Sequence, residues 1–435
     1  MATMREAARA REGAGGAVGW LVCGLGAVYF GYGYAVRVSP SAMLDELMRD
    51  LSASATVLGT LAGIYFYVYA AMQLPLGLTI DRLGPRRVLT FAALLCAAGV
   101  ALFAAAEDVA IAYLARGLIG AGAAAAFASG VKLTSLWLPP WRFALAVGLI
   151  NLVGMIGGTL GQAPLAMAVD AIGWRSVMGW LALGGVALSA AMWATRFAGP
   201  PPLAQPVRVG GRAVLRTVLA RRASWATAMF LSVSVAPVHA FSTLWGAPWG
   251  VAVYGVERPA AVALASASLL GWGAGAPLVG WLSDRMGRRR PALMLAPIGA
   301  LLTWPILLYA PPPLWLAYPL LFLSGCCTAG ALTAFAAAKE FTPPSAAATM
   351  TGLLTATSMV ATALMQFVVG WMLDLQWDGR IENGLRIYDA RAYILAFTSI
   401  PAAQLLALAL VRFVPETFCR QCVEDAGAEA RSTKR

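Results

Sequence analysis

The sequence predicts an all-α polytopic membrane protein whose twelve transmembrane helices form two six-helix repeats in parallel orientation. Three observations predict it: 60% of the 435 residues are hydrophobic and only 12% are charged, long uncharged runs recur throughout, and one short polar turn occurs twice. A bilayer core about 30 Å thick needs about 20 apolar residues per helix, so the chain has room for twelve spans. Because lipid offers the backbone no hydrogen-bond partner and the runs lack period-2 alternation, the spans should be helices rather than strands.

Polar stretches divide the chain into five predicted parts. The first apolar run is too long for the core of a signal peptide, so we keep it as the first helix. The parts are a cytoplasmic leader at 1–16, an N-terminal six-helix bundle at 17–197, a cytoplasmic central loop at 198–224, a C-terminal six-helix bundle at 225–414 and a cytoplasmic tail at 415–435. The apolar runs lie near 17–38, 56–78, 87–106, 109–135, 143–168 and 174–197, and then near 225–250, 259–282, 290–310, 313–337, 346–373 and 393–414.

The distribution of basic residues predicts the orientation in the membrane. With the N-terminus inside, 24 of the 32 Lys and Arg residues fall on the cytoplasmic side and eight on the other. This is the positive-inside pattern, so we expect both termini in the cytoplasm of a bacterial-type inner (plasma) membrane. The net charge of +12 is therefore mostly a topology signal. No basic soluble segment is long enough for a nucleic-acid-binding domain, so nucleic acid is not an expected partner.

The two halves of the chain are internal repeats. Residues 77–87 read GLTIDRLGPRR and residues 280–290 read GWLSDRMGRRR, with their Asp residues 203 positions apart. With six helices per half, the repeats have the same orientation, and in that plan the substrate site lies near the bilayer midplane at the interface of the halves. Further identities recur at an offset of 204: Pro139 with Pro343, Gly148 with Gly352, Gln162 with Gln366, and Asp170 with Asp374.

The duplicated turn Gly-x-x-x-Asp-Arg-x-Gly-x-Arg-Arg, among twelve apolar runs, resembles the signature loop of the major facilitator superfamily. Arg116 and Gly120 in the fourth run resemble that family's Arg-containing second motif, whereas Pro85 departs from the basic residue usual in the loop. The resemblance implies the family's fold and rocker-switch alternating access, with the loop locking the cytoplasmic gate when the protein faces outward. The loop residues carried over are Gly77, Asp81, Arg82, Gly84, Gly280, Asp284, Arg285 and Gly287.

Four local strings resemble one bacterial branch of that superfamily more narrowly. The branch includes intraphagosomal amino-acid transporters and is related to lysosomal dipeptide transporters, so this resemblance implies an amino-acid or short-peptide substrate. The strings are VSPSAM at 38–43, YFYVYAAMQLPLG at 65–77, LWGAPW at 244–249 and ETFCRQ at 416–421.

The residue chemistry of the turn agrees with a gating role. Gly84 and Gly287 permit a positive φ in a tight turn, and Gly77 and Gly280 permit close helix approach. An Asp at the end of the preceding helix can accept hydrogen bonds from basic side chains or face the N-terminus of a nearby helix. A contact made in one conformation only biases the equilibrium between outward-open and inward-open states. The basic cluster at 288–290 is expected only to anchor topology.

Polar side chains inside apolar runs are costly and mark candidate pathways. Arg37 and Lys132 could bind substrate or snorkel to headgroups, and both readings stay open. His239 and the aromatic side chains could line the pathway or pack. Arg116 is expected to be a structural or coupling residue. The substrate-binding candidates are Arg37, Tyr65, Tyr69, Gln73, Lys132, His239 and Trp245.

The acidic residues also inform the choice of substrate. No Asp or Glu falls in the middle of a run, which disfavours a cation exporter or a carboxylate proton relay, whereas Arg37 and Lys132 favour an anionic group. We therefore expect a secondary transporter of a small zwitterionic or anionic organic solute, such as an amino acid, short peptide or organic acid. The alternatives are an exporter of amphipathic compounds and a non-transporting membrane scaffold or sensor. A coupled proton stays open.

No catalytic, cofactor or metal site is predicted, so the chain is not expected to be an enzyme. Cys419 and Cys422 supply two thiolates where a closed zinc site needs four ligands, and no nucleophile–base constellation or phosphate loop is present. The expected partners are a small-molecule substrate and membrane lipid, and we expect the protein to work as a monomer.

Overall fold

The computed structural model describes residues 17–138, 140–195, 211–343, 346–382, 385–420 and Cys422. The predicted leader, most of the predicted tail and part of the predicted central loop lie outside these residues. The chain divides into two compact units, which are described separately below. The N-terminal unit comprises Met1–Ala53 and Ile64–Val207, and the C-terminal unit comprises Ser54–Gly63 and Arg208–Arg435.

Within the described residues, twelve helical segments are long and apolar enough to cross a membrane. They confirm the predicted fold class. The described strands are β1 and β2, a two-residue antiparallel pair in which Ile381 faces Arg386 and Glu382 faces Leu385. Large apolar side chains lie on the outer faces of the helices, for example Trp180, 68% exposed, and Trp315, 74% exposed. Such surfaces are unsuited to water and suit contact with lipid.

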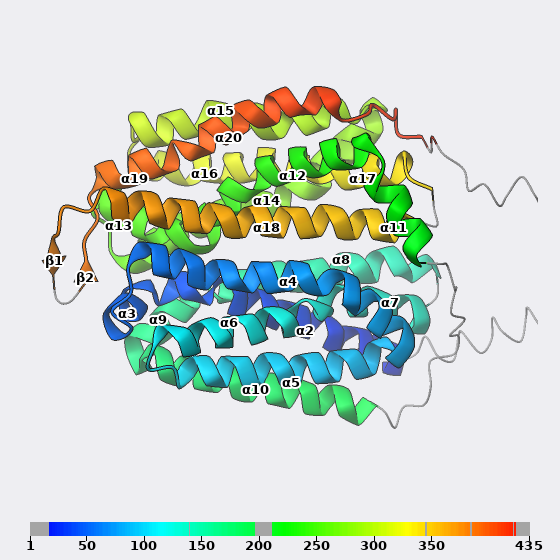
Figure 1. Cartoon of the computed structure of the whole chain (residues 1–435), viewed down its shortest axis with the longest axis horizontal. Coiled ribbons are helices and arrows are strands. Elements are labelled where there is room, and N and C mark those ends of the chain that lie inside the picture. Colours follow the sequence, from blue (N-terminus) through cyan, green and yellow to red (C-terminus); the bar gives the residue numbers. More distant parts are fainter. Residues whose placement is uncertain are drawn as a thin grey trace, which may run out of the picture. The chain divides into compact units, whose positions relative to one another are not determined.

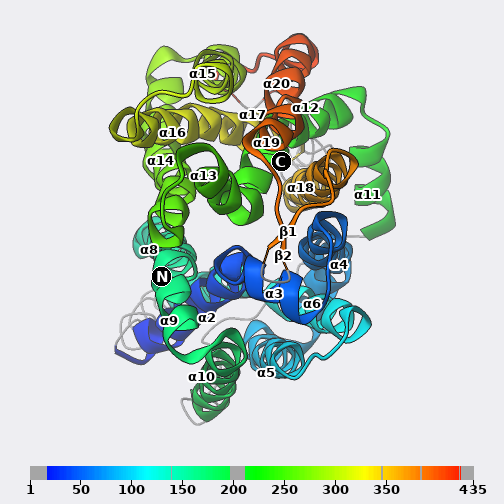
Figure 2. The same cartoon turned by 90° about the vertical axis from the view of Figure 1, so that its left-hand side faces the viewer.

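The N-terminal unit consists of long helices that lie side by side with short connections (Figures 1 and 2). Helix α2 packs against α8 and α7, and α5 packs against α10 and α6. The helices are α2 (Ala17–Ala42), α3 (Leu44–Asp50), α4 (Ala55–Leu83), α5 (Pro85–Ala104), α6 (Val109–Ala123), α7 (Ala125–Trp137), α8 (Pro140–Leu160), α9 (Ala163–Ile172) and α10 (Trp174–Ala194). Helix α4 belongs to both units, because its first nine residues group with the C-terminal one.

The C-terminal unit has a comparable plan, in which α14 packs against α16 and α12 packs against α18 (Figure 2). Its helices are α11 (Gly211–Leu219), α12 (Arg222–Ala240), η2 (Phe241–Trp245), α13 (Gly246–Tyr254), α14 (Arg258–Met286), α15 (Arg290–Tyr309), α16 (Leu314–Thr328), η3 (Ala329–Leu332), α17 (Thr333–Glu340), α18 (Ala347–Leu375), α19 (Ala390–Phe397), α20 (Ser399–Leu410) and η5 (Val411–Phe413), with strands β1 (Ile381–Glu382) and β2 (Leu385–Arg386) between α18 and α19. Helix α11 lies in the predicted central loop.

Several spans are interrupted, which apolar periodicity did not predict. The span Val109–Trp137 breaks between α6 and α7 at Ala124, and Leu314–Glu340 contains the 3₁₀ turn η3. These two breaks fall at nearly equivalent places in the two repeats. The span Arg222–Tyr254 contains the π-helical turn η2, and π turns inside α-helices are frequent at functional sites.

Candidate functional site

A buried arginine organises the second copy of the duplicated turn. Arg289, with a side chain only 8% exposed, pairs with Glu340 at the end of α17 (Nη2 to Oε1 2.5 Å) and with Asp284 at the end of α14 (Nη1 to Oδ1 2.7 Å). Its Nη1 also donates to Ser283 Oγ at 3.0 Å. Hydrogen bonding to Glu340 outweighs burial and, with Asp284, raises the pKa of Arg289. We call Asp284, Arg289 and Glu340 the Arg289 network.

The segment after α20 adds further contacts to this network. Glu416 accepts backbone N–H groups of Arg289 (2.8 Å) and Arg290 (2.9 Å) and of the two residues that follow it in sequence. Burial opposes ionisation of Glu416, but these four donors together lower its pKa. Thr417 donates its hydroxyl to Glu340, and the Cys422 N–H donates to the Glu340 carbonyl. The described residues 416–420 and Cys422 therefore form a tail strap across the turn.

Sequence reasoning gave Arg289 only a topological role, and it did not single out Glu340 or Glu416. Three successive arginines look alike in sequence, yet Arg288 is exposed while Arg289 is buried between two acidic side chains. Asp284 lies five positions away within the turn, whereas Glu340 and Glu416 lie 51 and 127 positions away. No local pattern connects Arg289 to Glu340 or Glu416, so only the fold identifies these two partners.

The backbone of both turns has the conformation expected from their glycines. Gly84 has φ 82° and Gly287 has φ 62°, values that other residues rarely adopt. Among the described residues, a side chain placed at Gly77 or Gly280 would meet no atom within 4 Å. The close helix approach expected at these positions is found instead at Gly275, where the Cys326 backbone leaves no room for a Cβ.

The other turn residues are placed differently in the two copies. Arg82 is exposed at the end of α4, and the Arg285 guanidinium lies 5.3 Å from the centre of the exposed Trp281 ring. The side chain of Asp81 lies outside the described part of the structure. The gating roles of these residues stay predictions.

The N-terminal unit buries two arginines close to one another. Arg37, five residues before the end of α2, is 6% exposed, and its guanidinium carbon lies 4.6 Å from the Phe66 ring centre and 5.0 Å from that of Tyr34. Its Nε has no hydrogen-bond partner among the described residues. Arg116 is 1% exposed and lies 5.0 Å from the Tyr65 ring centre.

Arg116 is one of two side chains that donate to a backbone carbonyl which a proline has left without its helical partner. In an α-helix the carbonyl of residue 36 would accept the N–H of residue 40, but Pro40 has none. The Val36 carbonyl accepts instead the Ser39 hydroxyl at 3.0 Å and Arg116 Nη1 at 3.0 Å, and Arg116 Nη2 donates to the Arg37 carbonyl at 3.3 Å. Arg116 therefore fixes the backbone that carries the Arg37 side chain.

The remaining candidates of the N-terminal unit lie at different depths. Tyr65 is 2% exposed and its ring centre is 5.9 Å from that of Tyr69, while Tyr69 and Gln73 are half-buried on the same helix. Lys132 is exposed near the end of α7. The packing of α4 thus brings Tyr65 to Arg116, whereas Lys132 lies on the surface of its unit.

In the C-terminal unit, the π turn η2 and α18 form a buried polar contact. The Gln366 Nε2 donates to Thr243 Oγ1 at 3.0 Å, and the fully buried Trp245 donates from Nε1 to the Gln366 carbonyl at 3.2 Å. His239 lies one turn before, with its ring 4.8 Å from that of Trp272. Sequence reasoning noted Gln366 only as a repeat marker. Whether His239 or Trp245 meets substrate stays a prediction.

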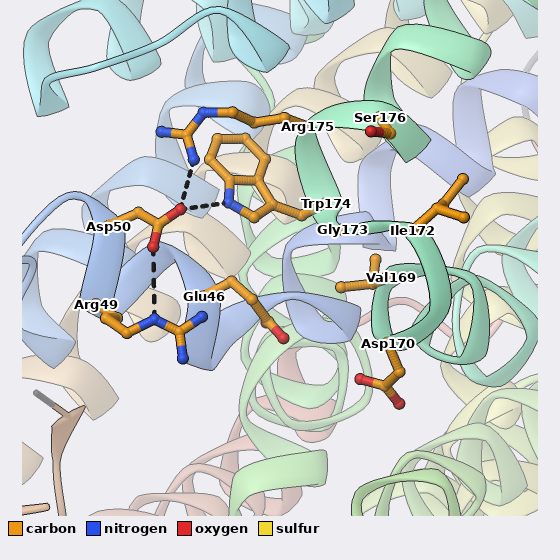
Figure 3. A pocket seen from close by; sticks show the side chains of 10 residues that line it. All are labelled: Glu46, Arg49, Asp50, Val169, Asp170, Ile172, Gly173, Trp174, Arg175 and Ser176. Atoms are coloured by element: carbon orange, nitrogen blue, oxygen red, sulfur yellow. Dashed lines mark hydrogen bonds and ion pairs between the residues drawn. The ribbon is translucent and has the colours of Figure 1, made fainter. Parts of the chain in front are cut away.

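A groove of about 570 Å³ opens at one end of the N-terminal unit (Figure 3). Asp50 occupies one side, where it accepts a hydrogen bond from Trp174 Nε1 at 2.9 Å and pairs with Arg175. Arg175 also donates to the Ala106 carbonyl at 3.2 Å. Burial opposes ionisation of Asp50, but the Trp174 and Arg175 contacts together lower its pKa. These bonds join α3, α10 and the α5–α6 connection, so this charge cluster is a structural tie.

The described residues contain no group of three or more His, Cys, Asp or Glu side chains that could hold a metal ion. Cys419 and Cys422 are free thiols, and burial raises the pKa of the Cys419 thiol.

Two curated relatives show different extents of similarity. The chain is 26% identical over 168 residues to the probable sulfoacetate transporter SauU of Cupriavidus necator, which covers 39% of each chain. It is 26% identical over 367 residues to the probable nitrate/nitrite transporter NarK2 of Mycobacterium tuberculosis, or 82% of this chain and 90% of that one. The chain matches the first curated relatives over only 33% to 39% of their length.

Solved structures agree on the fold. A bacterial homologue of the human lysosomal transporter Spinster, in an inward-facing and unoccupied conformation, superposes with a TM-score of 0.75 at 16% identity, covering 92% of this chain and 98% of that one. The family model of the Major Facilitator Superfamily matches residues 23–366, most of the 435 residues. The chain therefore belongs to the Major Facilitator Superfamily.

Proposed function

We propose that the protein is a secondary transporter of a small organic solute that carries a carboxylate or another anionic group, and that it works by alternating access. Membership of the superfamily supports the transport class. The names of two relatives, probable transporters of sulfoacetate and of nitrate/nitrite, support an anionic cargo. Amino acids and short peptides stay within the proposal because each carries a carboxylate.

The buried side chain of Arg37 is the observation that carries this proposal. Burying an unpaired ion costs several kcal/mol, whereas contact with aromatic rings returns only about 0.5–2 kcal/mol. Tyr34 and Phe66 supply such contacts, and the described part of the structure shows no acidic side chain paired with Arg37. An anionic substrate would supply the missing charge. A planar guanidinium is suited to bidentate binding of a carboxylate.

Arg116 has a supporting role in this proposal. Its donors are engaged by the carbonyls of Val36 and Arg37, and its guanidinium lies beside Tyr65. We therefore assign substrate recognition to Arg37 and its positioning to Arg116.

The Arg289 network supports the alternating-access part of the proposal. A contact that forms in one conformation and breaks in the other shifts the equilibrium by its own free energy. Arg289 joins the ends of α14 and α17 and the tail strap at one end of the C-terminal unit. We infer that this network stabilises one state of the transport cycle.

Counterflow in proteoliposomes tests the proposed function. Vesicles loaded with an unlabelled organic acid, amino acid or dipeptide should accumulate the labelled compound, with and without a pH gradient, and protein-free vesicles should not. Arg37→Gln should reduce the initial rate at least about tenfold, the equivalent of about 1.4 kcal/mol. Arg142→Gln, which changes an exposed arginine, should keep the initial rate of the wild type. Failure of every anionic compound to exchange would overturn the proposal and favour a non-transporting role.

A further inference from the structure

The first turns of α4 pack within the C-terminal unit, although the rest of the helix belongs to the N-terminal one. Ser54–Gly63 groups with the unit that contains α18, and Ile64 begins the part of α4 in the other unit. Because α4 is one continuous helix, any motion that separates its start from α18 must break the contacts made there.

A carboxylate from α18 caps the start of α4. Asp374 accepts the backbone N–H of Thr56 at 2.8 Å through Oδ2 and that of Ala55 at 3.2 Å through Oδ1. The first N–H groups of a helix have no partner inside it and favour a negative charge. The neighbouring Ser54 hydroxyl accepts a long bond from Val57, at 3.4 Å, and itself bonds to Asp374. The main cap of this helix therefore lies more than 300 residues away in sequence.

The segment between α18 and α19 completes the cap. Tyr388 donates its hydroxyl to Asp374 Oδ1 at 2.6 Å and accepts the Ala55 N–H at 3.2 Å. Arg386 of β2 places Nη1 3.7 Å from the same carboxylate. Asp374 is thus held by a hydroxyl and a guanidinium while it binds α4.

Close backbone packing continues this contact along the two helices. A Cβ on Gly370 would collide with the Ala55 carbonyl, and one on Gly59 would collide with the Gln366 carbonyl. The two glycines let α4 and α18 approach at positions one turn apart, as small residues do in membrane helix pairs. Gln366 also holds the π turn η2 through Thr243. The start of α4 is therefore connected to the interrupted helix of the C-terminal unit.

Asp374 and the Arg289 network lie at opposite ends of the C-terminal unit. Helix α18 begins beside α17, which ends at Glu340, and runs the length of the unit to Leu375 (Figure 1). By the predicted orientation, the Arg289 end is cytoplasmic and the Asp374 end faces outward.

We propose, resting on the transport function proposed above, that Asp374 and Tyr388 form an outer latch that holds the start of α4 against α18 and must open once in each transport cycle. The latch fixes one conformation from the outer end, as the Arg289 network does from the other end. Asp374 is a positioning residue, since it acts through α4 and not on the substrate. Removing it should destabilise the latched state and change the rate of the cycle.

Hydrogen exchange of residues 55–63 in the substrate-free protein tests the latch independently of any substrate. Asp374→Ala should accelerate exchange at the first turn of α4 at least about tenfold, because its N–H groups lose their acceptor. Tyr388→Phe and Asp374→Asn should give smaller increases, and Asp378→Asn, at an exposed carboxylate four residues on, should give none. Each variant must first elute as a monodisperse species. Unchanged exchange in Asp374→Ala would overturn the latch.

Counterflow with the same variants tests the part of the outer latch in the transport cycle. We expect the maximal rate in Asp374→Ala to change at least about threefold, and that of Asp378→Asn to remain as in the wild type. Faster hydrogen exchange in Asp374→Ala together with an unaltered transport rate would overturn the latch as a step of the transport cycle. A wild-type protein that transports no organic anion in counterflow would instead refute the proposed function. The hydrogen-exchange measurement would still decide whether Asp374 holds α4.

Discussion

At the scale of single residues, the two buried arginines of the N-terminal unit have different surroundings. Arg116 donates to carbonyls and lies beside an aromatic ring, whereas within the described residues the Arg37 guanidinium lies against the rings of Tyr34 and Phe66. The difference arises from Pro40, which frees the Val36 carbonyl for Arg116. Residue type alone did not separate the two roles, because both are arginines within apolar runs.

A double-mutant cycle between Arg116 and Pro40 tests this reading. Arg116→Gln should remove a charge-assisted hydrogen bond and leave the Ser39 hydroxyl as the remaining donor to the Val36 carbonyl, at a cost of about 1.5–3 kcal/mol. Pro40→Ala restores an N–H at position 40 and should therefore recover part of the stability lost in Arg116→Gln. The measurement is the free energy of unfolding in detergent for the four proteins. Strictly additive effects would contradict the donor-replacement account.

Arg289 and Arg288 offer a second test at this scale. Arg289→Gln should destabilise the protein by about 3 kcal/mol, because Glu340, whose side chain is 14% exposed, would lose its cation. Arg288→Gln is the matched control at an exposed neighbour and should change stability by less than about 0.5 kcal/mol. Equal effects in denaturant titrations would contradict a special role for Arg289.

At the scale of elements, the tail strap is held by an acid that binds backbone. Glu416 accepts four N–H groups, including those of Arg289 and Arg290, and they lower its pKa despite partial burial. The strap therefore depends on the ionised form of one side chain. It links the end of the helical region to the turn between α14 and α15.

The pH dependence of strap attachment follows from that shift. A carboxyl group whose pKa is lower in the folded state contributes its full stabilisation of that state when the pH is above its ordinary pKa, which is 4.5 for Glu416. The contribution is lost as the pH falls through the lower pKa of the folded state. Limited proteolysis of the tail should therefore be constant from pH 8 to about pH 5 and accelerate only below 4.5. Glu416→Gln should be cleaved faster throughout, and Glu382→Gln, at an exposed acid, should match the wild type. Acceleration near neutral pH would contradict the assignment.

Some element boundaries were predictable and others were not. Twelve apolar runs and the polar turns predicted the spans because the bilayer imposes length and composition. The breaks at Ala124 and at Ala329–Leu332, and the π turn Phe241–Trp245, keep the same apolar composition, so hydropathy does not reveal them. They depend on packing between helices distant in sequence, as in the bond from Gln366 to Thr243.

At the scale of the whole molecule, the repeats predicted the architecture but not the contacts that distinguish the two ends of the C-terminal unit. The duplicated turn identifies two equivalent places, yet Arg289 also binds Glu340 and, through its backbone, Glu416 of the tail strap, and both acids lie outside the turn. Asp374 was found as a repeat marker, and its role as the cap of α4 required the three-dimensional arrangement. Local sequence thus predicts the superfamily, while the residues proposed for gating and substrate binding depend on contacts over long sequence distances.

The most direct test of the central claim compares binding of a transported carboxylic acid and its amide by wild-type protein and by Arg37→Gln. Charge-assisted hydrogen bonds contribute about 1.5–3 kcal/mol, so the wild type should prefer the acid by about tenfold to a hundredfold. Arg37→Gln should lose most of that preference while binding the amide nearly as before, and Arg37→Lys should keep part of it. Equal loss of affinity for acid and amide in Arg37→Gln would contradict recognition of the anionic group by Arg37.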